Sequence, residues 1–393
     1  MAAIDKVLTV AEMKRLAHRR VPKMFFEYAD SGSYTEGTYQ QNESDFAKIL
    51  LNQKVAVNLE GRNLKVDMLG KEITMPVAIA PAATGGMQTA DGEIKAARAA
   101  EKFGIPFTLS TMSVCSIEDV AENTTAPFWF QLYVMRDRDF IGRLIDRAKA
   151  AKCSALVLTM DLQILGQRHK DIKNGLATPP KFTPYSIWQM MQHPLWCMRM
   201  LGTKRHTFRN IVGHVSGDHD LASLSSWTAS QFDPTLNWGD VRWVKERFGG
   251  PVIVKGVLDA DDARAAVDNG ADAIVVSNHG GRQLDGAPSS IRVLPEIVDA
   301  VGHRTEVYMD SGIRSGQDVL KALAYGAKST FIGRPMLYGL GAGGEAGVTR
   351  VLEIIRKELD TTMALCGERD ILNVGLHNIY SNDIPPRNAP KRG

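Results

Sequence analysis

The chain has 393 residues, of which 44% are hydrophobic and 23% are charged, and its formal net charge at pH 7 is +3. This globular composition excludes a long disordered arm, and the small net charge argues against a basic nucleic-acid surface. The length fits one large α/β barrel that carries insertions.

The four cysteines are scattered and none forms a C-x-x-C pair. They predict neither a disulfide framework nor a thiol metal site, and we expect no metal. Residues 1–20 lack the apolar core of a signal peptide, and no apolar run approaches the roughly 18 residues of a membrane span. We therefore expect the protein on the cytoplasmic side of the inner membrane, either free or in peripheral contact with it.

Residues 1–70 predict a helical preface to the barrel. Residues 9–22 have helical spacing, and residues 22–32 predict a second helix that ends at Gly32. We expect this segment to cap one end of the barrel.

Eight short β-rich runs follow, each succeeded by a segment with helical spacing. Apolar residues on both faces of these runs indicate buried parallel strands, and helical segments such as 90–104 and 259–270 are the expected crossovers. The predicted fold class is α/β, a (β/α)8 TIM barrel over residues 71–367 with an N-terminal helical segment and a tail at 368–393, in a single domain over 1–393. The runs begin at Met75, Pro106, Phe128, Ala155, Pro251, Ala273, Glu306 and Ser329.

One connection, the one after the fourth strand, is a large insertion at residues 162–240. Within it, PYSIWQMMQHPLWCMRMLG (184–202) is rich in Trp, Met and Leu but too polar to span a membrane. Long barrel loops commonly serve as active-site lids or docking surfaces. Two alternatives stay open here: contact with a membrane surface or partner, or a lid packed on the protein itself.

Polar side chains gather at the predicted C-terminal ends of the strands, where barrel enzymes carry their functional residues. Any one of them has a structural alternative, such as a helix cap for Asp310 or a surface ion pair for Arg334. Seven of the eight ends carry a polar or charged group, which a purely structural barrel would not bury together. In chain order the residues are Ala82 and Ala83, Ser110, Gln131 and Tyr133, Thr159 and Asp161, Lys255, Ser277 to Arg282, Asp310 to Arg314, and Gly333 with Arg334.

The last two loops, DSGIRSG and GRP, predict a phosphate site. Their glycines let backbone amides approach an anion, and Arg314 and Arg334 neutralise it. Ser110, Gln131 and Thr159 offer neutral hydrogen-bonding groups to a planar heterocycle, and Lys255 can stabilise negative charge on it. Together they predict a phosphorylated flavin across the barrel mouth.

A G-x-G-x-x-G match at Gly339, Gly341 and Gly344 does not open the first helix of a βαβ unit. We therefore reject a nicotinamide site there.

The loop SNHGGRQLDG (277–286) places an imidazole three residues before a guanidinium. Such residues are more often surface or capping groups, but two glycines beside His279 leave space for a ligand. His279 is a candidate base, Arg282 a candidate carboxylate clamp, and Asp161 a candidate partner that orients the imidazole.

Together with the segments FQLYV, DSGIRSG and FIGRP, this loop makes the chain resemble the FMN-dependent 2-hydroxy-acid dehydrogenase/oxidase family. The resemblance extends from about Val10 to about Gly367. The segments GSYTE, LSTMSVCSIEDV and HPLW to FDPTLNW are most similar to its bacterial respiratory branch, the L-lactate dehydrogenases.

The resemblance implies a role for each matching residue. It implies His279 as the base with Asp161 as its partner, Arg282 and Arg168 on the substrate carboxylate, and Tyr28 and Tyr133 at the substrate, with Tyr133 also in the catalytic set. The implied FMN contacts are Ala82, Ala83, Ser110, Gln131, Thr159, Lys255, Ser277, Asp310, Ser311, Gly312, Arg314, Gly333 and Arg334.

Three departures from the family pattern bear on specificity. Ala83 stands where respiratory members often have glycine and oxidases have alanine, Met112 replaces an aromatic found in glycolate oxidase, and the usual proline after Asp161 is absent.

The expected activity is FMN-dependent oxidation of an L-2-hydroxy acid by either a hydride or a carbanion route. The leading candidate reaction is the oxidation of L-lactate to pyruvate. The expected electron acceptor is a quinone or cytochrome, and the resemblance implies a homo-oligomer, a tetramer. The alternatives are a soluble oxidase that uses oxygen, a mandelate-type dehydrogenase and, in a different class, a flavin-free barrel scaffold.

Overall fold

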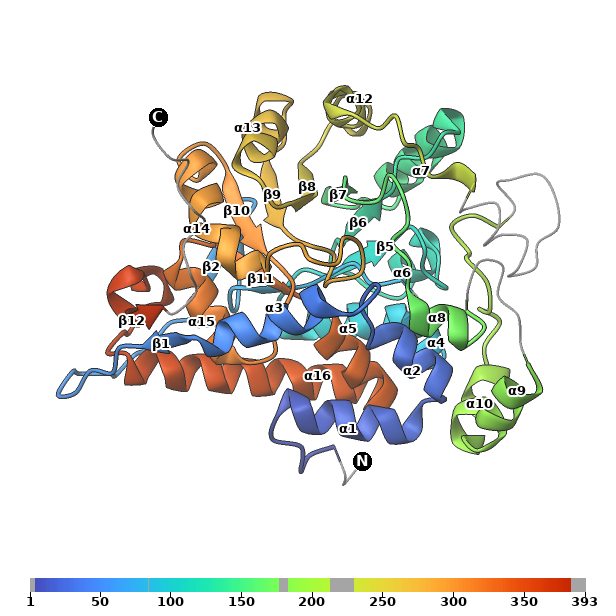
Figure 1. The fold of residues 1–393 in the computed structure, drawn as a ribbon, viewed down its shortest axis with the longest axis horizontal. Helices are drawn as coiled ribbons and strands as arrows, with labels where there is room; N and C mark the ends of the chain where they lie inside the picture. Colours follow the sequence, from blue (N-terminus) through green and yellow to red (C-terminus); the bar gives the residue numbers. More distant parts are fainter. Residues whose placement is uncertain (1–3, 84, 177–182, 213–229, 383–393) are drawn as a thin grey trace.

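The computed structural model describes residues 4–83, 85–176, 183–212 and 230–382. At its centre lie eight parallel strands (Figure 1), as the sequence predicts. The predicted (β/α)8 barrel is confirmed. The strands are β4 (Val77–Ile79), β5 (Thr108–Ser110), β6 (Trp129–Leu132), β7 (Ala155–Thr159), β8 (Val252–Val257), β9 (Ala273–Val276), β10 (Glu306–Met309) and β11 (Ser329–Ile332).

The barrel closes between its first two strands. The hydrogen-bonded order runs from β4 through β11, β10, β9, β8, β7 and β6 to β5. A bridge between Ile79 and Phe107, with the Ile79 N–H donating to the Pro106 carbonyl at 2.9 Å, joins β4 to β5. Closure leaves no exposed edge, and both faces of each strand are covered, which explains the continuous apolar runs.

Helices surround the barrel and connect successive strands. The predicted crossovers at 90–104 and 259–270 are confirmed as α5 and α13. In α13 the Asp259 carboxylate accepts the Asp261 N–H at 2.8 Å, an ordinary N-cap. The helices are α4 (Gly85–Gln88), α5 (Gly92–Phe103), α6 (Ile117–Ala121), α7 (Arg138–Ala150), α12 (Trp238–Phe248), α13 (Ala260–Asp268), α14 (Ser290–Val301), α15 (Gly316–Ala324) and α16 (Arg334–Leu365).

The glycines of the rejected nucleotide motif lie inside α16, where they permit close packing. A Cβ on Gly341 would lie 2.7 Å from Val21, just beyond the end of α1 (Val10–Arg20), and one on Gly339 would lie 2.8 Å from the Gly347 carbonyl. Gly343 and Gly344 depart from helical geometry and kink α16 at this point. Gly341 thus allows α1 to lie against α16 along the base of the view in Figure 1.

The preface is only partly helical. α1 and α2 (Lys23–Ala29) are confirmed, although α2 ends before the predicted Gly32. A third helix, α3 (Gly37–Ala47), follows, and the expectation of helix alone is wrong beyond it. Three short strands occur there, each too short for a clear sequence period: β1 (Ile49–Leu51) and the antiparallel hairpin of β2 (Val66–Met68) and β3 (Lys71–Ile73).

The tail returns to the preface. It forms two 3-10 turns, Ile371–Asn373 and Leu376–Asn378, and then β12 (Ile379–Asn382). β12 pairs antiparallel with β1, so the tail and the later part of the preface meet in a small sheet.

The insertion carries α8 (His169–Lys173), α9 (Pro184–Met191) and α10 (Pro194–Leu201), while its residues 177–182 and 213–229 lie outside the described chain. α9 and α10 lie at one corner of the molecule in Figure 1. Trp196 of α10 stacks on Phe25 of α2 at 5.0 Å and donates its indole N–H to the Met87 carbonyl at 3.1 Å. In the part of the chain that the structure describes, no helix is both long and apolar enough to span a membrane.

The contact between α15 and α16 depends on Gly316, because a Cβ there would lie 2.1 Å from the Leu359 nitrogen and 2.4 Å from the Ile355 carbonyl oxygen. We expect Gly316→Ala to lower the free energy of unfolding by about 1 to 3 kcal/mol through overpacking. Urea denaturation followed by circular dichroism measures this change. Gly202→Ala is the matched control, because the nearest atom to its Cβ would be 3.4 Å away. Equal stability of the two variants would contradict the prediction.

Candidate active site

A cavity of about 490 Å³ lies at the C-terminal ends of the barrel strands, where the sequence places the functional residues. Strand ends, the preface and the insertion all contribute to its wall. The predicted site residues that line it are Tyr28, Ala82, Ala83, Tyr133, Arg168, Lys255, His279, Arg282, Asp310, Ser311, Gly312, Arg314, Gly333 and Arg334.

Three predicted polar residues lie buried side by side on adjacent strands. The Ser110 hydroxyl donates to Gln131 Oε1 at 2.9 Å, and Gln131 Nε2 donates to the Thr159 hydroxyl at 3.0 Å. All three side chains are at most 2% exposed. This chain of hydrogen bonds fixes the direction of the Gln131 amide across β5, β6 and β7.

Lys255 continues the polar floor on the other half of the barrel. Its ammonium donates to the Ser277 hydroxyl at 2.9 Å and lies 3.3 Å from an Asp310 carboxylate oxygen. Burial alone would lower the pKa of Lys255, but the nearby carboxylates of Asp310 and Asp161 outweigh it and raise the pKa. The ammonium is therefore a fixed positive charge at the floor of the cavity.

The loop after β9 adopts a left-handed backbone. His279, Gly280 and Gly281 have φ of +57°, +67° and +73°, a conformation that is strained for a residue with a Cβ such as histidine. The Ser277 hydroxyl accepts the His279 N–H at 3.1 Å, and the Ser311 hydroxyl accepts the Gly280 N–H at 3.0 Å. These two contacts hold the histidine in this conformation.

His279 pairs with Asp161, as the sequence predicts. The imidazole Nδ1 lies 2.9 Å from Asp161 Oδ1, which leaves Nε2 as the nitrogen available to a ligand. Burial lowers the pKa of His279 below its usual value, and Asp161 opposes that shift without overcoming it. Burial would raise the pKa of Asp161, but His279 and Lys255 outweigh burial and lower it. At pH 7 the pair is thus a neutral imidazole beside a carboxylate, the form that can accept a proton.

Two arginines line the cavity from neighbouring segments, Arg282 from the loop after β9 and Arg168 from the start of the insertion. Arg282 donates to the Tyr28 carbonyl at 2.7 Å, and its guanidinium lies 4.9 Å from the centre of the Tyr28 ring. Its other terminal nitrogen is 3.7 Å from the carboxylate of Asp171, a residue of α8. Burial lowers the pKa of Arg282 to about 10, so it remains charged at neutral pH. Arg168 Nε is buried and has no protein hydrogen-bond partner among the described residues, and the same is true of Asp161 Oδ2.

Arg314 and Arg334 line a further part of the cavity wall, here called the arginine end, where Arg334 and Arg282 donate to the same Ser31 carbonyl. Arg334 donates to the carbonyls of Ala29, Ser31 and Gly280 and lies 4.4 Å from the centre of the Tyr39 ring. Arg314 pairs with Glu43 at 2.9 Å. Gly312 and Gly333, from the same two loops, also line the cavity.

The arrangement suits a ligand with a planar polar part and an anionic end. Amide, hydroxyl and ammonium groups cover the floor at the strand ends, and the two arginines beside glycine backbone are suited to a phosphate. The orphaned buried donor Arg168 Nε indicates a second, smaller anionic ligand near His279, whereas the orphaned acceptor Asp161 Oδ2 is suited to a hydrogen-bond donor. Among the described residues no group of three or more His, Cys, Asp or Glu can hold a metal ion.

Several wall residues were not predicted as site residues. Asp171 lies three residues after Arg168 on a short helix, and this spacing was a usable signal. Phe208, from irregular chain in the insertion, and Phe232, at its end, carry no periodic signal at all.

The sequence profile of the FMN-dependent dehydrogenase family matches residues 17–381 of this chain. An L-lactate dehydrogenase of Pseudomonas entomophila (strain L48) is 45% identical over 365 residues, which cover 92% of this chain and 95% of that protein. An L-lactate dehydrogenase of Haemophilus influenzae (strain 86-028NP) is 42% identical over 369 residues, covering 94% and 97%.

Solved structures agree with these relatives. The monotopic membrane protein (S)-mandelate dehydrogenase superimposes with a TM-score of 0.91 at 34% identity, covering 96% of this chain and all of that one. A mandelate oxidase superimposes with a TM-score of 0.79 at 34% identity, covering 93% and 96%.

The His279 and Asp161 pair yields a direct prediction. Asp161→Asn removes the negative charge that opposes the effect of burial, so we expect the pKa of His279 to fall further below its usual value. NMR titration of histidine-labelled protein measures this change. His193, which lies between α9 and α10 and whose own pKa is lowered by burial, serves as internal control and should titrate unchanged. An unchanged or raised His279 pKa would show that Asp161 does not act on the imidazole.

Proposed function

The chain belongs to the FMN-dependent dehydrogenase family and uses FMN to oxidise a 2-hydroxy acid, and from this premise we propose that it oxidises L-lactate to pyruvate. The observation that carries the proposal is the neutral His279 imidazole, held by Asp161 within one cavity with Arg282 and Arg168. Such a set binds a small carboxylate and removes a proton near it.

In the proposed mechanism each protein group has one task. Arg282 and Arg168 bind the substrate carboxylate, and Tyr28 and Tyr133 border the same part of the cavity. His279 Nε2 takes a proton from the substrate, and the Asp161 carboxylate stabilises the imidazolium that forms. Both open routes fit this geometry, with the proton coming from either C2 or the hydroxyl group.

FMN would be held by the polar floor and the arginine end of the cavity. In the proposed arrangement Lys255, Gln131 and Thr159 act at the flavin ring, and Arg314 and Arg334 act at the phosphate. Bound FMN supplies the two-electron oxidant that converts the hydroxy acid to the oxo acid. The further proposed contacts are Ala82, Ala83, Ser110, Ser277, Asp310, Ser311, Gly312 and Gly333, all of which line the cavity or support its floor.

L-lactate is favoured over mandelate as the substrate by two observations. The curated relatives reported above, at 42 to 45% identity, are named L-lactate dehydrogenases, whereas the mandelate enzymes are 34% identical. The cavity wall also includes the bulky side chains of Met112, Phe208 and Phe232, which favour a small substituent on the substrate.

Electrons are proposed to leave toward a quinone or a cytochrome, as the relatives' name of dehydrogenase suggests. Ala83 lines the cavity and keeps the oxidase alternative open, because oxidases of the family carry alanine there. Homo-oligomerisation, as a tetramer, rests on the resemblance alone.

His279→Gln should lower turnover of L-lactate by about 10² to 10⁴ while FMN stays bound, because a general base is lost and the fold is kept. Turnover is measured with a panel of 2-hydroxy acids, using a quinone analogue, cytochrome c or oxygen as acceptor. His303→Gln, an exposed position outside the cavity, is the matched control.

Near-normal turnover of every acid by His279→Gln would refute the base assignment. Release of peroxide by the native enzyme at rates matching lactate loss would establish the oxidase alternative instead.

We also propose that the insertion contacts the membrane surface through α9 and α10. Their exposed side chains form an apolar area, here called the insertion patch, and Leu201 at its end is 84% exposed. A monotopic membrane protein is among the closely similar structures. The patch consists of Tyr185, Ile187, Trp188, Met191, Leu195, Met198 and Leu201.

The charge around the insertion patch supports an anionic lipid surface. No aspartate or glutamate occurs between Asp171 and Asp218, whereas Arg199 and Lys204 are exposed beside the patch. Apolar residues with flanking cations are typical of helices that lie in an anionic interface.

Replacement of Met191, Met198 and Leu201 by serine should therefore abolish or strongly reduce binding to anionic phospholipid vesicles, because the apolar contact is lost. Vesicle flotation measures the bound fraction. The control carries serine at the exposed Leu372, Leu376 and Tyr380 of the tail and should bind as the native chain does. If the native chain binds neither anionic vesicles nor native membranes, the proposed membrane contact is wrong.

A further inference from the structure

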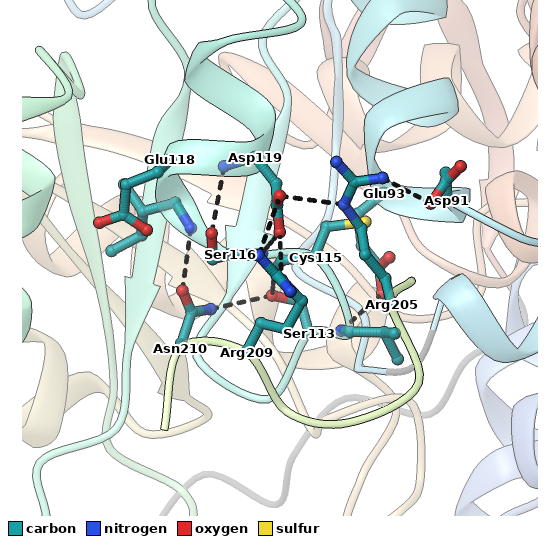
Figure 2. Close-up of polar contacts among 12 residues, drawn as sticks. Asp91, Glu93, Ser113, Cys115, Ser116, Glu118, Asp119, Arg205, Arg209 and Asn210 are labelled. Carbon is teal, nitrogen blue, oxygen red and sulfur yellow. Dashed lines mark hydrogen bonds and ion pairs between the residues drawn. The ribbon is translucent and has the colours of Figure 1, made fainter. Parts of the chain in front are cut away.

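The segment that follows the insertion patch is tied tightly to the barrel. We call residues 203–212 the return arm. At its start the Thr203 hydroxyl donates to an Asp91 carboxylate oxygen at 2.7 Å, and Arg205 Nη1 contacts the same oxygen at 3.0 Å. Asp91 directly precedes α5, so these contacts fasten the arm to the first crossover helix; Figure 2 shows the contact between Arg205 and Asp91.

Asp119 is the second attachment point. Its carboxylate contacts Arg205 Nε at 3.0 Å and Arg209 Nε at 2.7 Å, and it also accepts the Ser116 N–H at 2.8 Å in a capping box of α6 (Figure 2). Burial would raise the pKa of Asp119, but the Ser116 N–H and the two arginines outweigh it and lower the pKa. A carboxylate that already caps a helix thus holds two arginines of the return arm.

Asn210 joins the return arm to the loop after β5. Its Nδ2 donates to the carbonyls of Ser110 and Thr111 at 3.2 and 3.3 Å and to the Ser113 hydroxyl at 3.0 Å. Its Oδ1 accepts the Ile117 N–H at 2.9 Å. The residue is fully buried, so these bonds form without competition from bulk water.

The loop after β5 is also held from its other side. Glu93 of α5, 3% exposed, accepts the N–H of Val114 at 3.2 Å and that of Gly86 at 2.9 Å. The loop between these attachments carries Met112 into the cavity wall. Met112 therefore owes its position partly to Asn210.

Between Arg205 and Asn210 lies Phe208, whose side chain is 7% exposed and lines the same cavity. Its carbonyl accepts the N–H of Ile211 and that of Val212, both at 3.0 Å, in a tight turn. The insertion thus contributes one aromatic wall of the cavity, and that wall is held by its polar neighbours in the sequence.

We propose that Phe208 is a specificity-determining residue that limits the size of the substituent on C2 of the substrate. Asn210, Arg209 and Asp119 are positioning residues that keep Phe208 and Met112 together. This inference rests on the proposed function, because it concerns the same 2-hydroxy acid.

Binding of 2-oxo acids to the FMN holoenzyme tests the inference independently of turnover. The measured quantity is the ratio of the Kd for phenylglyoxylate, which is bulky, to the Kd for pyruvate, which is small, both from changes in flavin absorbance. We expect Phe208→Ala to lower this ratio at least ten-fold, the range in which apolar pockets discriminate by size. Phe248→Ala is the matched control, because Phe248 is 6% exposed and lies outside the cavity.

Variants of the positioning residues test the attachment. Asn210→Ala should lower the ratio in the same direction as Phe208→Ala, and the double variant should lower it no more than Phe208→Ala does alone, because both act on one wall. Arg209→Gln, at a side chain 38% exposed, serves if Asn210→Ala fails to fold, and Phe208→Leu serves in the same way for Phe208→Ala.

The outcomes separate the two proposals. If the native holoenzyme binds neither oxo acid, the proposed function fails and this inference fails with it. If the native holoenzyme binds pyruvate but Phe208→Ala changes the ratio no more than Phe248→Ala does, only the specificity role is overturned. If Phe208→Ala shifts the ratio while Asn210→Ala and Arg209→Gln do not, the positioning role is overturned.

Discussion

The close approach of the preface to the two glycine-bearing loops is the constraint on which the site depends. A Cβ on Gly281 would lie 2.5 Å from the Tyr39 nitrogen, and one on Gly312 would lie 2.2 Å from the Asn42 carbonyl oxygen. The side-chain amides of Asn42 and Asn278 donate to each other at 2.9 and 2.7 Å. The loop that carries His279 is thus shaped by backbone contact with α3, and no side chain other than hydrogen fits at either glycine.

Electrostatics then decide which ligands the cavity accepts. Five cationic side chains line it, against the two carboxylates of Asp171 and Asp310. Asp310 largely neutralises Lys255, Glu43 neutralises Arg314, and Asp171 partly neutralises Arg282, so the remaining positive charge lies near Arg168 and Arg334. A cavity with this excess favours two anionic groups at separate places. The cations are Arg168, Lys255, Arg282, Arg314 and Arg334.

The sequence predicts the parts of the site that lie on elements with a repeated sequence pattern, and it misses the parts that lie on irregular chain. Eight apolar runs predict the barrel, and reading the strand ends in order finds Lys255, Gln131 and the loop at His279, because strand ends of a barrel share one rim. Tyr28 emerges only from the resemblance. Phe208 and the pairing of β1 with β12 were not predicted, because irregular chain and strands of only three and four residues show no periodic pattern.

The insertion contributes both an exposed docking surface and a wall of the cavity. From the sequence, a docking surface and a lid packed on the protein were separate alternatives. Trp196 anchors α10 to the barrel through Phe25 and Met87, while exposed Leu201 lies at its outer end. Two residues later, Thr203 is bonded to Asp91, and Phe208 then enters the cavity wall. A docking face and a pocket wall thus belong to one short, fastened stretch of chain. The contacts at Asp91 and Asp119 lie along the chain between exposed Leu201 and the end of the return arm, so the pocket wall at Phe208 has attachments of its own to the barrel.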